Sequence, residues 1–208
     1  MIHLLIQRYP SLRAVESRIT SAARAITDCF RAGGKLLACG NGGSCSDSDH
    51  IVGELMKGFL RKRPLSELQK SAMKSKCPML TDECLQKLQG ALPAISLPSA
   101  TSLNTAFCND VDPDLVFAQS VLGLGKPNDI LICISTSGNS ANVVAAAEVA
   151  SSLGLVTVGL TGQDGGQLAQ LCDICICVPA TETYQVQELH LPVYHYLCAF
   201  VESELFPM

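Results

Sequence analysis

The sequence is poor in charged residues and has no long run of hydrophobic or basic residues. Only 16% of its 208 residues are charged, against roughly 25% in an average soluble protein. No apolar stretch approaches the roughly 18 residues of a membrane-spanning helix, so we expect no membrane span. Because hydrophobic residues make up 48% of the chain, we expect the surplus apolar surface to be buried between the subunits of a homo-oligomer.

Basic residues are also too scattered to indicate a nucleic-acid-binding protein. The net charge is −4, and the 15 Lys and Arg residues form no long run, although Lys57, Arg61, Lys62 and Arg63 cluster. We therefore expect no nucleic acid partner. The apolar stretch within residues 1–8 is too short for a signal peptide.

The cysteines indicate a location in the reducing cytoplasm rather than a disulfide framework. There are eleven, an odd number, and several lie inside apolar segments, where Cys behaves as a small hydrophobic residue. Cys172, Cys175 and Cys177 could suggest a metal knuckle. Cys175 and Cys177 alternate with isoleucines in a strand pattern, however, and zinc knuckles usually contain two spaced pairs of ligands.

Short apolar segments alternate along the chain with segments of helical pattern. The predicted strands are residues 36–39, 94–97, 129–134, 155–160 and 174–178. The predicted helices are residues 10–32, 44–60, 99–108, 112–122, 141–153, 166–171 and 183–205. Nearly continuous apolar strands that alternate with helices are typical of a parallel sheet covered on both faces. We therefore expect residues 1–208 to form a single α/β domain with a five-stranded parallel sheet, preceded by an N-terminal helix at 10–32.

Residues 62–92 are the least regular part of the sequence. Two short helices are expected there, at 66–75 and 81–88. We interpret this segment as an insertion. It is either a flap near a functional site or an elaboration of the surface.

A glycine-rich turn follows the first predicted strand. Residues 35–54 read KLLACGNGGSCSDSDHIVGE, so a strand leads through Gly40–Ser44 into a helix. This arrangement directs free backbone N–H groups at an anion. His50 and Glu54 are four residues apart and share one face of that helix. The pattern predicts a site for a phosphorylated molecule beside a metal, whereas the simpler interpretation is a hydrophilic loop with an N-capping serine.

A second polar loop follows the third predicted strand. Residues 135–140 read STSGNS and precede a predicted helix, so four hydroxyl groups and exposed amides could surround a phosphate without Lys or Arg. Capping alone could again explain such a loop. Both loops follow strands of a parallel sheet, and ligands in such folds bind at the carboxyl ends of the strands.

The last predicted helix carries Gln187, Glu188, His190 and His195. Spacing does not choose between the two histidines: Gln187 and His190 are i,i+3 neighbours, while Gln187 and His195 lie about 80° apart around an ideal helix. Pro192 should also kink this helix, which weakens any argument from angles. A histidine buried in the core or at an interface is the simpler interpretation of either one.

Three motifs, GNGGS-x5-H-x3-E, STSGNSANV and QE-x-H-x4-H, closely resemble the sugar isomerase (SIS) domain family. Within it they resemble the phosphoheptose isomerases, which convert sedoheptulose 7-phosphate to D-glycero-D-manno-heptose 7-phosphate. The resemblance covers about residues 10–64 and 93–205. It implies a flavodoxin-like three-layer α/β/α sandwich and a homotetramer with sites between subunits.

The resemblance also implies roles for individual residues. His50, Glu54, Gln187 and His195 match the zinc ligands of the family, which favours His195 over His190. Glu54 would be the base and His195 the acid of an aldose–ketose isomerisation through an enediol, with zinc polarising the carbonyl. The substrate-binding positions implied are Asn41, Gly42, Gly43, Ser44, Asn109, Asp110, Ser135, Thr136, Ser137, Ser140 and Gln187.

The sequence departs from the family pattern in three places. Residues 62–92 are longer than the usual link, Gly58 replaces an arginine for which Lys57 could substitute, and Tyr184-Gln185 replaces an Asp-Arg pair. An isomerase for another phosphosugar is therefore one alternative. SIS domains also serve as non-catalytic phosphosugar-binding regulators and protein-binding scaffolds. The presence of both Glu54 and His195 favours the enzyme.

Overall fold

The computed structural model describes residues 1–207, and its centre is one all-parallel sheet of five strands in the order β2-β1-β3-β4-β5. The strands are β1 (Leu36–Gly40), β2 (Ala94–Ser96), β3 (Ile130–Ile134), β4 (Val156–Thr161) and β5 (Ile174–Cys177). In the middle of the sheet, Leu36 pairs with Ala94 on one side and Ile130 on the other. This is the strand order of flavodoxin-like folds. The predicted five-stranded parallel sheet is therefore confirmed.

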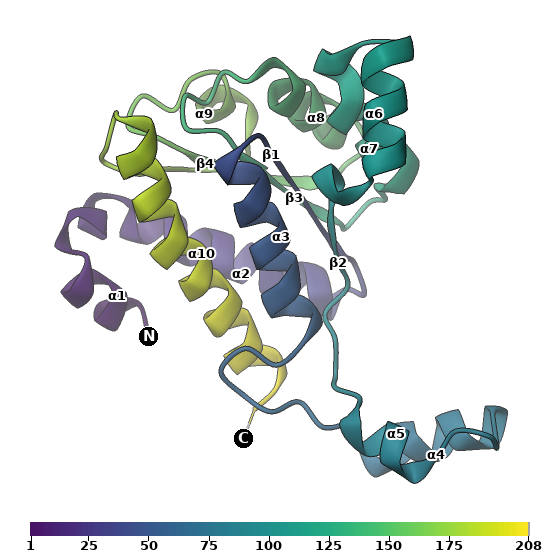
Figure 1. Ribbon diagram of the computed structural model, residues 1–208. Helices are drawn as coiled ribbons and strands as arrows, with labels where there is room; N and C mark the ends of the chain where they lie inside the picture. The colour runs from purple at the N-terminus through teal and green to yellow at the C-terminus, as the bar shows by residue number, and fades with distance from the viewer. Residues whose placement is uncertain (208) are drawn as a thin grey trace.

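Helices cover both faces of the sheet, which gives the expected three layers (Figure 1). One face packs against α2 (Glu16–Arg31), α3 (Gly43–Met56) and α10 (Thr183–Leu205), and the other against α7 (Val116–Leu124), α8 (Ala141–Ser152) and α9 (Leu168–Leu171). Alternate strand residues point to opposite faces. Thus Leu36 and Ala38 join the first core, whereas Leu37 and Cys39 join the second. Because both faces are covered, every residue of β1 is buried.

The N-terminal region differs from its prediction in two ways. Residues Ile2–Arg8 form a helix, α1, which the sequence analysis did not predict. The helix predicted at 10–32 begins as a 3-10 turn at Pro10–Val15 and continues as α2 from Glu16. Proline in the first turn is compatible with a helix start because its missing N–H would have no partner there.

Several further helix boundaries differ from their predictions. Helix α3 ends at Met56 rather than at residue 60, because Lys57 is already extended, with φ −136° and ψ 173°. The helix predicted at 99–108 is found as a 3-10 turn (Leu97–Ser99) followed by α6 (Thr101–Asp110). Asp112 accepts a hydrogen bond from the Asp114 N–H at 2.8 Å and caps a further 3-10 turn, Pro113–Leu115, ahead of α7.

Residues 62–92 form an arm that projects beyond the end of α3 (Figure 1). It contains α4 (Glu67–Lys76), which starts with a Ser66–Gln69 capping box, and α5 (Asp82–Lys87). No residue of α4 is buried and only Leu85 of α5 is. A Pro64–Gln89 bridge closes the base of the arm. Within residues 1–207, none of the helices is both long enough and apolar enough to cross a membrane.

Candidate active site

Three of the predicted site residues, His50, Glu54 and His195, meet where α3 packs beside α10. The Nε2 atom of His50 lies 3.2 Å from Oε1 of Glu54, as their i,i+4 spacing on α3 requires. The Nε2 atom of His195 lies 3.5 Å from Nε2 of His50. Two imidazoles and a carboxylate thus face one another across two helices.

His190 and His195 have different environments although both lie on α10. His190 is fully buried, and its Nε2 lies 3.3 Å from the carbonyl oxygen of Thr161. Burial lowers the pKa of His190 to about 4, so its ring is neutral. His195 instead faces His50, and its side chain is partly exposed to solvent. The structure therefore makes His190 a core residue and places His195 in the candidate site.

Gln187 lies against the glycine-rich turn at the start of α3. A Cβ atom on Gly43 would lie 2.4 Å from Nε2 of Gln187, so any larger residue at position 43 would have to displace the end of this side chain. Gly42, with φ +55°, adopts the left-handed conformation that favours glycine. The backbone of the turn therefore favours glycine at position 42, and the side chain of Gln187 lies at the N-terminal end of α3, ahead of His50.

Charge around Glu54 keeps its carboxylate ionised. Lys57 donates a hydrogen bond from Nζ to Oε2 of Glu54 at 2.9 Å. Burial acts to raise the pKa of Glu54, but Lys57 and His50 outweigh burial and lower it. Burial also lowers the pKa of His195, and the neighbouring His50 lowers it further. The lowered pKa of Glu54 favours its ionised form, and the lowered pKa of His195 favours its neutral form.

A pair of asparagines joins the glycine-rich turn to the first turn of α8, which directly follows the second polar loop. Asn41 donates from Nδ2 to Oδ1 of Asn142 at 2.8 Å, and Asn142 donates back to Oδ1 of Asn41 at 3.1 Å. Asn142 was not predicted as a site residue. The signal for it is its position in the first turn of α8, where a side chain can reach the neighbouring loop.

Hydrogen bonds within the second loop fix its shape. The Oγ atoms of Ser135 and Ser140 are 2.9 Å apart, and Ser137 Oγ accepts a hydrogen bond from the Asn139 N–H at 3.1 Å. Gly138 has φ +67° and packs so closely on Gly165 that a Cβ atom would lie 2.0 Å from its carbonyl oxygen. The hydroxyl groups therefore stay gathered at the N-terminus of α8, a suitable position for binding an anion.

The remaining predicted residues are placed differently. Ser44 is buried in the first turn of α3, and Thr136 is partly buried beside Ser135. Asn109 and Asp110 are exposed on the last turn of α6. Asn109 donates to Oδ1 of Asp110 at 2.8 Å. Within residues 1–207, neither side chain hydrogen-bonds to the other predicted site residues, so a single chain does not bring them into the site.

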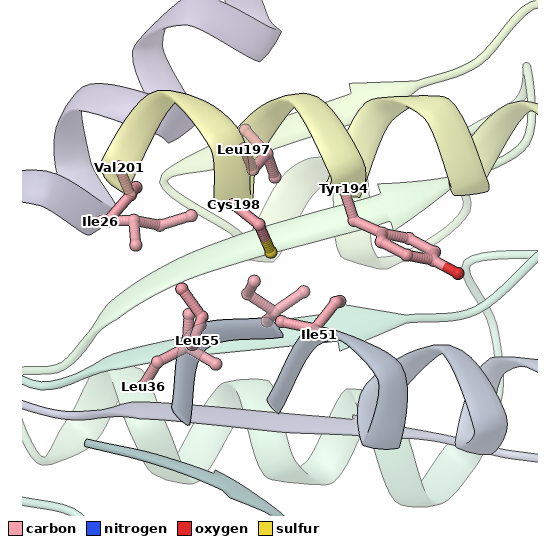
Figure 2. Close-up of a pocket in the computed structure, with 9 residues that line it drawn as sticks. Ile26, Leu36, Ile51, Leu55, Tyr194, Leu197, Cys198 and Val201 are labelled. Atoms are coloured by element: carbon pink, nitrogen blue, oxygen red, sulfur yellow. The ribbon is translucent and has the colours of Figure 1, made fainter. Parts of the chain in front are cut away.

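Two hollows lie near these residues. The smaller, about 10 Å³, is an apolar cavity in the core between α3 and α10, and Figure 2 shows the hydroxyl group of Tyr194 pointing away from it. That volume is about that of one water molecule, so the cavity is no substrate site. The larger hollow, about 500 Å³, is open beside His195. Its walls include apolar residues of α1 together with Phe59 and Leu60.

His50, Glu54 and His195 offer atom types that zinc binds, and two of the distances between these atoms suit a shared zinc ion. Ligands bound at about 2.0–2.1 Å around a tetrahedral ion lie about 3.3 Å apart. The separations of His50 from Glu54 and from His195 are 3.2 and 3.5 Å. Within residues 1–207, however, no group of three or more His, Cys, Asp or Glu side chains is arranged around a common metal position. Zinc therefore remains a prediction.

Known proteins resemble the chain over nearly its whole length. Sequence models described as SIS domain match residues 11–95 and 102–200. The phosphoheptose isomerase of Rhodospirillum rubrum is 40% identical over 90% of this chain and 86% of its own. That of a Roseiflexus species is 41% identical, over 93% and 87% respectively.

Solved structures agree with these matches. A phosphoheptose isomerase from Francisella tularensis superposes with a TM-score of 0.77 at 31% identity, covering 97% of this chain and 94% of its own. One from Neisseria gonorrhoeae gives a TM-score of 0.76 with the same identity and coverage. The chain therefore belongs to the SIS domain family, in its phosphoheptose isomerase branch.

Proposed function

We propose that the protein is a phosphoheptose isomerase that converts sedoheptulose 7-phosphate to D-glycero-D-manno-heptose 7-phosphate. The observation that carries this proposal is that His50 brings Glu54 and His195 together, because its Nε2 atom lies 3.2 Å from Glu54 and 3.5 Å from His195. The identity of 40–41% to curated phosphoheptose isomerases supports it. The whole chain then acts as one SIS domain, with residues 62–92 as an insertion.

Moving a carbonyl group from C2 to C1 requires one group that removes a proton from carbon and another that returns one. Glu54 is ionised next to Lys57 and takes the proton from C1. His195, in its protonated form, acts as the acid that returns a proton to C2 of the resulting enediolate, while the proton of the C1 hydroxyl passes to the C2 oxygen. The hydroxyl and amide groups of residues 135–140 hold the phosphate at the N-terminus of α8, which orients the sugar toward Glu54.

His50, Glu54, Gln187 and His195 would hold a zinc ion in this enzyme. When bound, zinc polarises the substrate carbonyl. His50 and His195 supply imidazole nitrogens and Glu54 supplies a carboxylate, all common zinc ligands. Gln187 would complete the set from the N-terminal half of α10.

The enzyme would work as a homotetramer in the cytoplasm, with its sites at subunit interfaces. Support for assembly comes from apolar side chains left exposed around the open hollow beside His195: Leu4 is 54% exposed and Leu60 is 69% exposed. Assembly could also bring Asn109 and Asp110 of one subunit to the site of another. Nothing in this arrangement requires a nucleic acid or a membrane.

Incubation with sedoheptulose 7-phosphate in deuterated water tests the proposal. We expect a heptose 7-phosphate product that carries one deuterium. No such product should form when a chelator is present. Glu54→Gln should lower turnover by roughly 10²–10⁴-fold with little change in substrate affinity. The matched control is Glu148→Gln on the exposed side of α8, which should leave turnover unchanged. Full turnover by Glu54→Gln would refute the assignment of the base, and binding without turnover or exchange by the wild type would indicate a regulator.

A further inference from the structure

Tyr194 connects α10 to α3 through two hydrogen bonds that the proposed chemistry does not use. Its side chain is 1% exposed. The hydroxyl group lies 3.1 Å from Oδ1 of Asp47 and 3.1 Å from Nδ1 of His50. Figure 2 shows the Tyr194 ring at the apolar cavity, with its hydroxyl oxygen pointing away from the other residues that line the cavity. One hydroxyl thus joins a carboxylate to the ring of a candidate metal ligand.

The chemistry of the three groups determines the direction of both hydrogen bonds. A carboxylate only accepts, and a tyrosine hydroxyl has a single proton to donate. If Tyr194 donates that proton to Asp47, its oxygen accepts from the Nδ1–H group of His50. The opposite direction would use the Tyr194 proton on His50 and leave Oδ1 of Asp47 without a donor.

That opposite direction is costly because Asp47 already lacks partners. Its other oxygen, Oδ2, is buried and has no hydrogen-bond partner within residues 1–207. Losing the Tyr194 donor as well would leave both oxygens of Asp47 unsatisfied, and buried polar groups without partners are strongly disfavoured. On the other side of the ring, Oε1 of Glu54 could accept a proton from Nε2 of His50, at 3.2 Å. Glu54 already has a charged donor in Lys57, however, whereas Asp47 depends on Tyr194. The arrangement therefore favours the tautomer of His50 that carries its proton on Nδ1.

We propose that Tyr194 and Asp47 are positioning residues that hold His50 in its Nδ1–H tautomer, so that the lone pair of Nε2 is free to bind a metal. The Nε2 atom is the one that faces Glu54, at 3.2 Å, and His195, at 3.5 Å. Hydrogen bonds to the second nitrogen of a metal-binding histidine commonly fix its tautomer and ring orientation. The consequence for zinc rests on the proposed function, whereas the tautomer itself does not.

The position of Tyr194 in the chain makes this contact specific. It immediately precedes His195, and their rings are 5.1 Å apart, edge to face. The same turn of α10 therefore supplies both a candidate ligand and the group that orients its partner on α3. Tyr196, two residues further, offers a matched control because it is also a buried tyrosine of α10.

Nuclear magnetic resonance of the metal-free protein with ¹⁵N-labelled histidine measures the tautomer directly. The chain has four histidines, and His50→Gln assigns the signal of interest. We expect the Nδ1–H form of His50 in the wild type and in Tyr196→Phe, and a mixture of tautomers in Tyr194→Phe. A wild-type spectrum dominated by the Nε2–H form would overturn the proposal, even if Tyr194→Phe failed to fold.

Zinc affinity, measured by competition with a chromophoric chelator, gives the second readout. Tyr194→Phe should bind zinc about 10–100-fold more weakly than the wild type, whereas Tyr196→Phe should bind it equally well. Equal affinities for Tyr194→Phe and the wild type would refute the positioning role. If the wild type bound no zinc, the proposed metal site would fail, and the tautomer of His50 would still decide the present inference.

Discussion

Two carboxylates at the contact between α3 and α10 are satisfied to very different degrees. Glu202, on α10, is fully buried and accepts four hydrogen bonds. The donors are the backbone N–H groups of Phe59, Leu60 and Arg61 and the Nε–H of Arg63, at 2.7–3.0 Å. Arg63 is itself 1% exposed and donates to the carbonyl oxygens of Leu55 and Glu54. Glu202 therefore anchors the end of α3, the turn that carries Glu54.

Asp47, near the start of α3, is left largely unsatisfied. It accepts from Tyr194, and its buried Oδ2 has no partner within the described part of the chain. The pKa values of Asp47 and Glu202 are shifted in opposite directions from their ordinary values. Burial raises the pKa of Asp47, and the Tyr194 hydrogen bond only partly offsets it. At Glu202 burial also acts to raise the pKa, but the N–H groups and Arg63 outweigh it and lower the value.

The difference in hydrogen bonding indicates that Glu202 serves the fold and Asp47 serves the candidate site, although both lie where α3 contacts α10. A fully hydrogen-bonded ion pair fixes where the chain runs, and it would perform that task without substrate or metal. An under-satisfied carboxylate adds little to stability, and such groups are expected where a fold serves a site rather than its own stability. Asp47 is linked to the side chain of His50 by a single residue, Tyr194. Glu202 is linked through Arg63 to the backbone carbonyl of Glu54, not to its side chain.

The largest expected effect is therefore on stability, at Glu202. Glu202→Gln leaves the Arg63 guanidinium buried without a counter-charge, so we expect it to lower the free energy of unfolding by about 3–5 kcal/mol in urea denaturation. The matched control is Glu204→Gln. Its pairing with Arg31 is exposed, with side chains 42% and 52% accessible, so its loss should cost less than about 1 kcal/mol. Equal losses at the two positions would show that Glu202 is no anchor.

Acid should weaken the same anchor. Because the pKa of Glu202 in the folded protein is below its ordinary value of 4.5, the unfolded chain binds its proton first, and the contribution of Glu202 is present above that value. It is lost as the pH falls through the lower, folded pKa. The difference in stability between the wild type and Glu202→Gln should be largest at pH 7 and shrink below pH about 4.5. A difference that stayed constant from pH 7 to 3 would contradict the lowered pKa.

Much of the fold follows from local patterns in the sequence. The five apolar runs became strands close to their predicted residues because a parallel sheet covered on both faces needs continuous apolar segments. The spacing of His50 and Glu54 likewise placed their side chains together, as the 3.2 Å separation confirms. The end of α3 was predicted four residues too late, although Gly58, directly after the C-cap residue Lys57, is a common helix-stop signal. What the sequence does not reveal is the partner of the following N–H groups, which is Glu202, 142 residues from Leu60.

The parts of the site that sequence reasoning missed depend on distant partners. Spacing could not choose between His190 and His195, because it does not reveal which side of α10 packs on Thr161. Tyr194 looks like an ordinary core residue among apolar neighbours. Its role appears only when Asp47, 147 positions away in the chain, is placed against its hydroxyl group.

The smallest effect on stability should come from Asp47→Asn. The amide oxygen of asparagine can still accept the Tyr194 proton, and the buried Oδ2 atom has no hydrogen bond to lose. Since the substitution also removes a partly buried charge, we expect the free energy of unfolding at pH 7 to stay within about 1 kcal/mol of the wild type. Urea denaturation alongside Glu202→Gln measures both carboxylates under one set of conditions. A loss at Asp47 as large as that at Glu202 would mean that both are structural anchors, and the contrast between the two ends of α3 would disappear.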